Sequence, residues 1–415
     1  SGVAGTTADL FALSGSTGQW ASSSRSEGYA TAAGERWRFA QFGDTLVATN
    51  YSDEIQALDL AVGGSWADLN PDDAPRARYI ATVREFLFTL NIVDQTGTKP
   101  NRARWSAQGD PGSWPLPGTV EAKGVLSDKQ DFNDLGEGRG IVAGLTSGDV
   151  ALFFDNGVVV GIFRADPDII FQFDTVEGAR GLAAPDSLIK IGGEVFYLGP
   201  DDFYLFNGTT STAIGNTEIA DFFFRNVDQS NIGLTVGAAS PFSKKLFWFY
   251  VGVNSTDGSL DSALCFDREV NEWASIEGVK VQCLTTAVSP GFSIEDMDEV
   301  AQSLDEIPGS LDDRIYAGGG LPDLAAFNEQ HQLALFSGEP LAARIETDEY
   351  ILTAGRRSTL VRVRPMVDGV APTVRVITRD KGSALAVTHA PQTVNQDGAV
   401  LPRVLTLAQV TQLLR

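Results

Sequence analysis

Histidine, cysteine and methionine are nearly absent from this chain of 415 residues, which has two of each. His331 and His389 are too few for a histidine-based catalytic triad or for a histidine-rich zinc site, so neither is expected. Cys265 and Cys283 lie in apolar, strand-like segments. Their number excludes a disulfide scaffold, and we expect buried free thiols in a protein that folds in a reducing cytosol.

Positive charge and long apolar runs are also scarce. The 31 lysines and arginines face 54 aspartates and glutamates, which gives a net charge of −23. Such a surface repels nucleic acid at long range, so a DNA partner would pass by without being bound tightly. No stretch approaches 18 consecutive apolar residues, and the sequence therefore predicts no membrane-spanning helix.

What the chain does contain is a repeated pattern: a short apolar or aromatic strand, a polar residue, a turn, and often a tryptophan. The polar residues of the copies are Ser14, Asp59, Ser106, Asp155, Asn207, Asp267 and Asn328. Successive copies are 45 to 61 residues apart, a spacing typical of the four-stranded blades of a β-propeller. One blade cannot bury both of its faces alone, so blades pack around a common axis.

Four tryptophans follow their turns at similar offsets, namely Trp20, Trp66, Trp114 and Trp273. A large residue at this place packs against the neighbouring blade, and we interpret all four as blade-packing residues. The same side chains could alternatively stack on sugar rings if they lay exposed at loop tips.

The sequence predicts an all-β fold with two domains. The repeat indicates a β-propeller of about six blades over residues 1–340, followed by a small C-terminal β-sheet domain over 341–415. Short helices are predicted as insertions at 217–224, where Thr217 would cap the helix, and at 295–313, which is strongly acidic. A terminal helix is predicted at 406–415 from the spacing of its apolar residues.

Several segments together carry a resemblance to a known family. They are 37–44 with 48–50, 74–79, 104–114 and 360–365. In this order along one chain they resemble the β-propeller tail proteins of short-tailed bacteriophages, called nozzle, hub or tail tubular protein B. The resemblance covers about residues 8–380. Family chains usually have a longer N-terminal part that completes the first blade, and more chain after the arginine-rich strands.

The resemblance implies a six-fold ring below the portal and its adaptor. Such a ring forms the distal DNA channel and a platform for tail fibre or needle proteins. It would belong to the virion tail and would be assembled in the cytoplasm of the bacterial host. The family offers no catalytic residues to carry over to this sequence.

Paired carboxylates are the remaining material for chemistry. Asp201 and Asp202, for example, would serve a propeller glycosidase only if two such groups faced one another in a central pocket. Acidic turns between strands explain these residues without catalysis. Asp296, Asp298 and Glu299 lack the glycine and the regular spacing of a calcium loop. We therefore predict no catalytic residue, no metal site and no cofactor.

A series of arginines distinguishes the last part of the chain from its acidic remainder. Its members are Arg344, Arg356, Arg357, Arg362, Arg364, Arg375 and Arg379. Solvent-facing strand positions would explain them. Alternatively, they dock on an acidic patch of a neighbouring subunit, such as one with Glu295, Asp296, Asp298 and Glu299. Contact with DNA phosphates is a third explanation.

These observations favour a structural virion protein over an enzyme. We expect a homo-oligomer, a hexameric ring, through which double-stranded DNA passes transiently. An acidic bore would give the phosphates no gain from counterion release, so the DNA would not adhere. The alternatives are a carbohydrate- or receptor-binding propeller of a tail, and a propeller glycosidase.

Overall fold

The chain divides into two compact units, Ser1–Phe336 and Ser337–Arg415. The computed structural model describes, in the first unit, residues 2–13, 19–115, 131–135, 141–146, 150–154, 156–164, 170–176, 179–288 and 322–336. In the second unit it describes 345–346, 358–359, 362–363, 373–379, 387–388, 392–393, 399–400, 406–407 and 409–414.

Five sheets of the first unit have four antiparallel strands each, joined in sequence order. The first two contain β4 (Arg38–Phe42), β5 (Thr45–Thr49), β6 (Gln56–Asp59) and β7 (Ala67–Asp68), then β8 (Arg76–Val83), β9 (Phe86–Asp94), β10 (Gly97–Trp105) and β11 (Asp131–Asp134). The third contains β12 (Ile141–Thr146), β13 (Val150–Phe154), β14 (Val158–Phe163) and β15 (Phe171–Thr175). The last two contain β16 (Ile189–Ile191), β17 (Glu194–Leu198), β18 (Phe203–Phe206) and β19 (Ser211–Ala213), then β20 (Val236–Ala239), β21 (Lys245–Tyr250), β22 (Leu260–Asp267) and β23 (Glu272–Val281).

Two further sheets have three described strands each, one formed by the first residues of this unit and one by its last residues. They are β1 (Val3–Gly5), β2 (Leu10–Leu13) and β3 (Trp20–Ser22), and β24 (Cys283–Val288), β25 (Pro322–Phe327) and β26 (Leu333–Leu335). The two sheets meet where the rings of Trp20 and Phe327 lie 5.7 Å apart.

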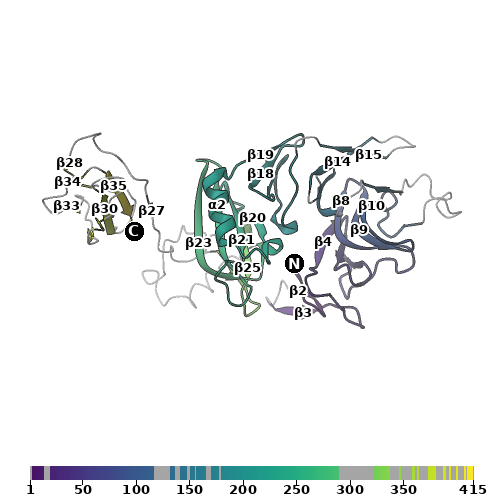
Figure 1. Cartoon of the computed structure of the whole chain (residues 1–415). Coiled ribbons are helices and arrows are strands. Elements are labelled where there is room, and N and C mark those ends of the chain that lie inside the picture. Colours follow the sequence, from purple (N-terminus) through teal and green to yellow (C-terminus); the bar gives the residue numbers. More distant parts are fainter. Residues whose placement is uncertain are drawn as a thin grey trace. The chain divides into compact units, whose positions relative to one another are not determined.

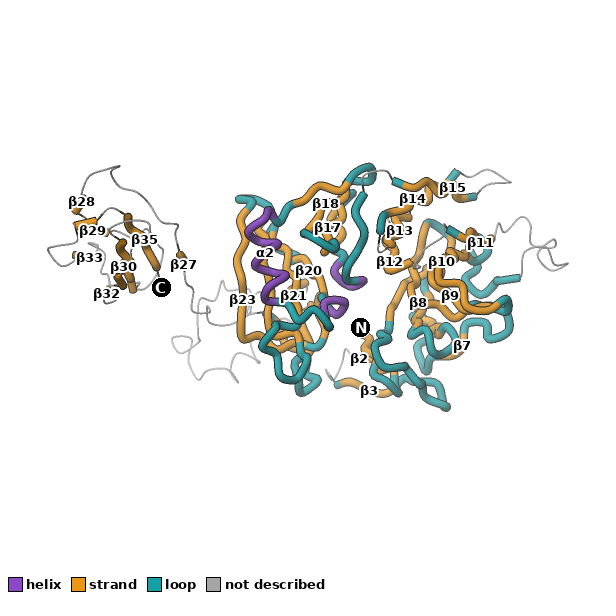
Figure 2. The backbone as a smooth tube through the Cα atoms, viewed as in Figure 1, coloured by secondary structure: helices purple, strands orange, loops and turns teal. Residues whose placement is uncertain are grey.

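The sheets form a β-propeller, and the prediction of an all-β fold with about six blades is confirmed. The first strands of neighbouring sheets contact one another, β4 with β8, β8 with β12, β16 with β20, and β20 with β24. These strands are therefore the inner ones. In Figure 1 the labelled sheets follow one another around a common centre, and Figure 2 shows that strands dominate the unit.

Aromatic side chains between neighbouring sheets form the core. Phe88 on β9 stacks on Trp105 of β10 at 5.2 Å, and both rings meet the edge of Phe171 from the next sheet. All three side chains are almost fully buried. At about 25 cal/mol per Å² of apolar surface, such contacts are what hold one blade against the next.

The described residues contain one α-helix, α2 (Asn216–Asn226), where the sequence predicts a helix at 217–224. The predicted cap is wrong by one residue, because the side chain of Asn216, and not Thr217, accepts hydrogen bonds from the amides of Glu218 and Ile219. Phe223 is fully buried and packs on Phe203 at 5.1 Å.

The second unit is also built of strands. They are β27 (Ile345–Glu346), β28 (Ser358–Thr359), β29 (Arg362–Val363), β30 (Thr373–Arg379), β31 (Val387–Thr388), β32 (Gln392–Thr393), β33 (Ala399–Val400), β34 (Thr406–Leu407) and β35 (Gln409–Leu414). Strand β35 pairs with β30 from Val374↔Leu414 to Arg379↔Gln409.

The prediction of a terminal helix at 406–415 is therefore wrong. Ten residues are too few for a helix to be stable without tertiary support. The apolar spacing of so short a segment suits either structure, and pairing along the whole of β30 favours the strand. The acidic segment predicted as a helix, 295–313, lies outside the described residues.

None of the helices in the described part of the chain has the length and apolar character required to cross a membrane.

Candidate functional site

Charged side chains line a hollow of about 270 Å³ where two inner strands of the propeller begin. Arg38 is the first residue of β4, Arg36 lies two residues before this strand, and Arg78 lies on β8. Asp186 lies on the short 3-10 helix η2 (Pro185–Ser187), directly before the inner strand β16. Because inner strands surround the axis of a propeller, this hollow occupies the position where many propellers bind ligands.

Asp186 joins two arginines from a sheet that is not its neighbour. Arg36 donates from Nη1 to Oδ2 at 3.1 Å, and Arg38 donates from Nη2 to Oδ1 at 3.0 Å. The sheets β8–β11 and β12–β15 lie between β4 and β16 along the ring. Both oxygens of one carboxylate therefore link opposite parts of the propeller.

Two other contacts hold the rim of this hollow. Arg78 pairs with Glu35 at 2.6 Å, and its guanidinium lies over the ring of Tyr51 at 4.4 Å. The guanidinium of Arg38 lies 4.5 Å from the centre of the Tyr79 ring. Burial raises the pKa of Tyr79 to about 12, so its hydroxyl stays protonated at neutral pH.

The charges of the hollow nearly cancel, since three guanidinium groups meet the two carboxylates of Glu35 and Asp186. The paired side chains keep about a fifth to a third of their surface exposed, so each pair stabilises the fold by about 0–1 kcal/mol. We name Arg36, Arg38 and Asp186 the axial clasp. Its ion pairs link sheets that are not neighbours along the ring.

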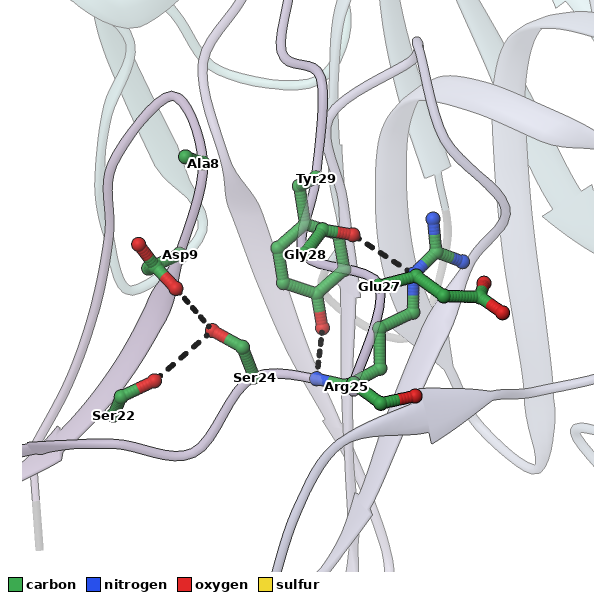
Figure 3. Close-up of a pocket in the computed structure, with 9 residues that line it drawn as sticks. Ala8, Asp9, Ser22, Ser24, Arg25, Glu27, Gly28 and Tyr29 are labelled. Carbon is green, nitrogen blue, oxygen red and sulfur yellow. Dashed lines mark hydrogen bonds between the residues drawn. The ribbon is translucent and has the colours of Figure 1, made fainter.

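A second, larger hollow of about 490 Å³ lies beside the loop that follows β3 (Figure 3). Ser24 donates to Asp9 at 3.1 Å, and the amide of Arg25 donates to the Tyr29 hydroxyl at 3.3 Å. The lining is rich in hydroxyl and charged groups, and its single aromatic residue, Tyr29, is buried. The hollow thus offers no ring on which a sugar could stack.

Arg25, which also lines this hollow, is held by two carboxylates of the next sheet. Its Nη1 pairs with Asp68 at 2.6 Å, and its Nη2 pairs with Asp53 at 3.1 Å. Burial by itself would lower the pKa of Arg25, but the hydrogen bond and charge of Asp68 outweigh this effect and raise the pKa. The network fastens the loop to the sheet β4–β7.

Among the described residues, no three His, Cys, Asp or Glu side chains gather closely enough to hold a metal ion. His331 is exposed and its Nδ1 lies 2.7 Å from Oε1 of Gln282. Cys265 is buried as expected, whereas Cys283 is exposed, which corrects the expectation of two buried thiols. Cys283 begins β24, an inner strand of which most side chains are not buried.

The four tryptophans of the repeat all contact a neighbouring sheet. Trp66 and Trp114 are 2 % and 0 % exposed, in apolar clusters shared by two sheets. Trp273 lies 5.1 Å from Phe203 of the preceding sheet, and Trp20 touches Phe327. Trp66 and Trp114 are therefore not available to stack on a carbohydrate.

The predicted docking residues are only partly described. Outside the described residues lie Glu295, Asp296, Asp298, Glu299, Arg344, Arg356, Arg357 and Arg364. Arg362 lies on β29, and Arg375 and Arg379 lie on β30. The side chain of Arg375 is half-buried, and its Nε has no hydrogen-bond partner among the described residues. The docking of this series stays a prediction.

The sequence analysis did not predict the axial clasp, although its two arginines belong to a pattern that the sequence shows. Arg-x-Arg occurs at two successive inner strands, as Arg36–Arg38 leading into β4 and as Arg76–Arg78 at the start of β8. In an extended segment, alternation places both arginines of such a pair on one face. Their partner Asp186 is about 150 residues away in the chain, and no local pattern identifies it.

No family model matches the chain, and no curated protein matches it either. Similar solved structures include the mitotic checkpoint complex, at 11 % identity and a TM-score of 0.37 over 66 % of this chain and 76 % of that one. BamB from Moraxella catarrhalis has 11 % identity and a TM-score of 0.35 over 68 % and 87 %. Dihydro-heme d1 dehydrogenase NirN in complex with DHE has 8 % identity and a TM-score of 0.38 over 92 % and 67 %. Similarity this low carries no argument about function.

Proposed function

We propose that this chain is a structural protein of a short bacteriophage tail, one subunit of a hexameric nozzle or hub. The ring would guide DNA during ejection and would bind the adaptor or portal on one side and fibre or needle proteins on the other. The observation that carries the proposal is the axial clasp. Its ion pairs lie where other propellers bind ligands, and they restrain the blades. Such a restraint suits a rigid structural subunit.

The DNA channel of this ring would lie between subunits. A hollow of about 270 Å³ has the volume of roughly nine water molecules, far too little for a duplex. A net charge of −23 supports a channel wall that does not hold DNA, because phosphates release no counterions on meeting carboxylates. The segments named for their resemblance to tail nozzle proteins support the same function.

The burial of Trp66 and Trp114 weakens the rival interpretation as a carbohydrate-binding propeller, because two of its four candidate stacking residues are inside the fold. Nothing in the described geometry favours a glycosidase over a structural role.

The size of the assembly tests the proposal. Native mass spectrometry and light scattering should show six copies, alone or on addition of the adaptor ring of a short-tailed phage. Negative-stain images of that sample should show rings. A chain that stays monomeric at all salt concentrations, both alone and with the adaptor, would contradict the proposal.

A further inference from the structure

The turn between β18 and β19 begins with an asparagine that is followed by a glycine. The sequence has two such pairs, at 156–157 and 207–208, and the second lies in a turn whose residues are all described. The strand pair Phe206↔Ser211 leaves residues 207–210 to make this turn. Asn207 and Gly208 are exposed, so water and dissolved base reach both of them. Gly208 has a φ of 96°, a backbone conformation that favours glycine.

The side chain of Asn207 folds back onto the turn. Its Oδ1 accepts hydrogen bonds from the amides of Thr209 and Thr210, each at 3.0 Å, and from the Thr209 hydroxyl at 2.9 Å. These bonds hold the carboxamide beside the peptide bond that joins Asn207 to Gly208. Three donors on one carbonyl oxygen also stabilise the negative charge that develops there when a nucleophile attacks the carbon Cγ.

Asn328 has a similarly bonded side chain but a different neighbour. Its Oδ1 accepts from the amides of Gln330 and Gln332 at 3.0 and 2.9 Å. The next residue, however, is Glu329, whose side chain crowds its own amide nitrogen as glycine cannot. The Nδ2 of Asn328 also donates to Gln332 at 3.2 Å, and this bond must break before the nitrogen can leave. At Asn207, in contrast, a bonded side-chain carbonyl and an unhindered backbone nitrogen occur together.

We propose that Asn207 is a site of spontaneous covalent modification, at which the folded chain deamidates. The amide nitrogen of Gly208 loses its proton to a base from the solvent and bonds to Cγ of Asn207. The bond between Cγ and Nδ2 then breaks, and the nitrogen leaves as ammonia with a proton from the solvent. Water opens the resulting succinimide ring at either carbonyl, which leaves isoaspartate or aspartate and one new negative charge. The inference does not depend on the phage-tail function.

Isoaspartate at this position would disturb the outer part of the blade, because it adds one carbon atom to the backbone of the turn. Strand β19 is joined to β18 by three residue pairs. Ser211, its first residue, accepts a hydrogen bond from the amide of Arg180 at 3.1 Å and lies 2.7 Å from the hydroxyl of Tyr197. We therefore expect the modification to loosen β19 and to weaken these contacts.

The test follows Asn207 in the full, folded chain at pH 8.5 and 37 °C in water that contains heavy oxygen. Samples are digested in ordinary water, and mass spectrometry with electron-transfer fragmentation identifies each product. We expect progressive conversion of Asn207, with heavy oxygen incorporated and isoaspartate formed, at least tenfold above the conversion of Asn328 in the same sample. The reaction should be slower at pH 6.5, because the attacking nitrogen must be deprotonated.

A free peptide of residues 203–213 shows how fast the same sequence reacts without the fold. If Asn207 stays intact in the chain while this peptide converts, the folded turn prevents the reaction and the proposal is wrong. Equal conversion at Asn207 and Asn328 would also overturn it, because the argument separates these two sites.

Asn207→Ser is the matched variant for the structural effect. Serine keeps a side-chain oxygen that can accept hydrogen bonds in the turn, but it cannot form a succinimide. Hydrogen exchange in the β18–β19 hairpin should become faster as the wild type is incubated and should stay unchanged in Asn207→Ser. Equal acceleration in both proteins would show that a reaction elsewhere loosens β19, which would contradict the proposal.

Discussion

At the scale of single residues, ion pairs that cross the propeller support the proposed structural role more than any one reactive group does. Asp186 uses one oxygen for Arg36 and the other for Arg38, and hydrogen bonds between ionised groups are stronger than those between neutral ones. The contribution of each pair is small because the side chains are partly exposed. Their position, however, connects sheets that are not neighbours along the ring.

Replacing Asp186 with asparagine tests the clasp. Asp186→Asn keeps the shape of the side chain but removes the anion, so two guanidinium groups lose their partner. We expect a loss of about 1 kcal/mol in the free energy of unfolding, together with faster hydrogen exchange at the start of β4. Asp221→Asn is the control, because its pair with Arg225 is exposed and lies within α2. Equal effects of the two variants would show that Asp186 joins nothing across the axis.

At the scale of elements, the outer strand β11 illustrates how a blade is fastened at its edge. Arg102 on β10 forms a two-point contact with Asp134 of β11, at 2.6 and 2.8 Å, and it also bonds to Asp94 at 2.9 Å. The hydrogen bond from Arg102 lowers the pKa of Asp134. Burial by itself would raise the pKa of Asp94, but bonds from Thr96 and Arg102 outweigh it and lower the pKa.

These shifts define a pH dependence. A carboxyl whose pKa is lower in the folded state stabilises the fold above its unfolded pKa, here near 3.8, and this stabilisation is lost as pH falls through the folded pKa. Arg102→Met should cost about 3 kcal/mol at pH 7, because it leaves Asp94 buried without its cation. We expect the difference from the wild type in denaturant unfolding to stay constant down to about pH 4 and to shrink below it.

Arg225→Met serves as control for this series, since its partner Asp221 is exposed and a cost near zero is expected at every pH. A wild-type advantage over Arg102→Met that grew on acidification would contradict the sign of the pKa shifts.

At the scale of the whole molecule, the dominant property is the excess of negative charge. Several arginines of the first unit are matched by carboxylates in ion pairs, as in the axial clasp and at Arg25 and Arg102. Little free positive charge is left in these pairs to attract phosphates.

We therefore expect the purified chain not to bind double-stranded DNA even at low salt, where electrostatic attraction is strongest. Fluorescence anisotropy with a labelled duplex at 20 to 200 mM salt checks this. Micromolar affinity that falls steeply with added salt would reveal a basic surface and would argue against a channel wall that lets DNA slide.

The repeated strand-and-turn pattern was sufficient to predict the propeller, because each copy needs a neighbour to cover its face and tryptophans such as Trp66 and Trp114 follow several of the turns. Composition was likewise sufficient to predict the acidic character of the molecule. The tertiary structure decided two other points. It made 409–414 a strand, because β30 offered an edge for pairing over residues 374–379, and it brought Asp186 to Arg36 across the axis. Such features depend on contacts between residues far apart in the chain, which no local pattern encodes.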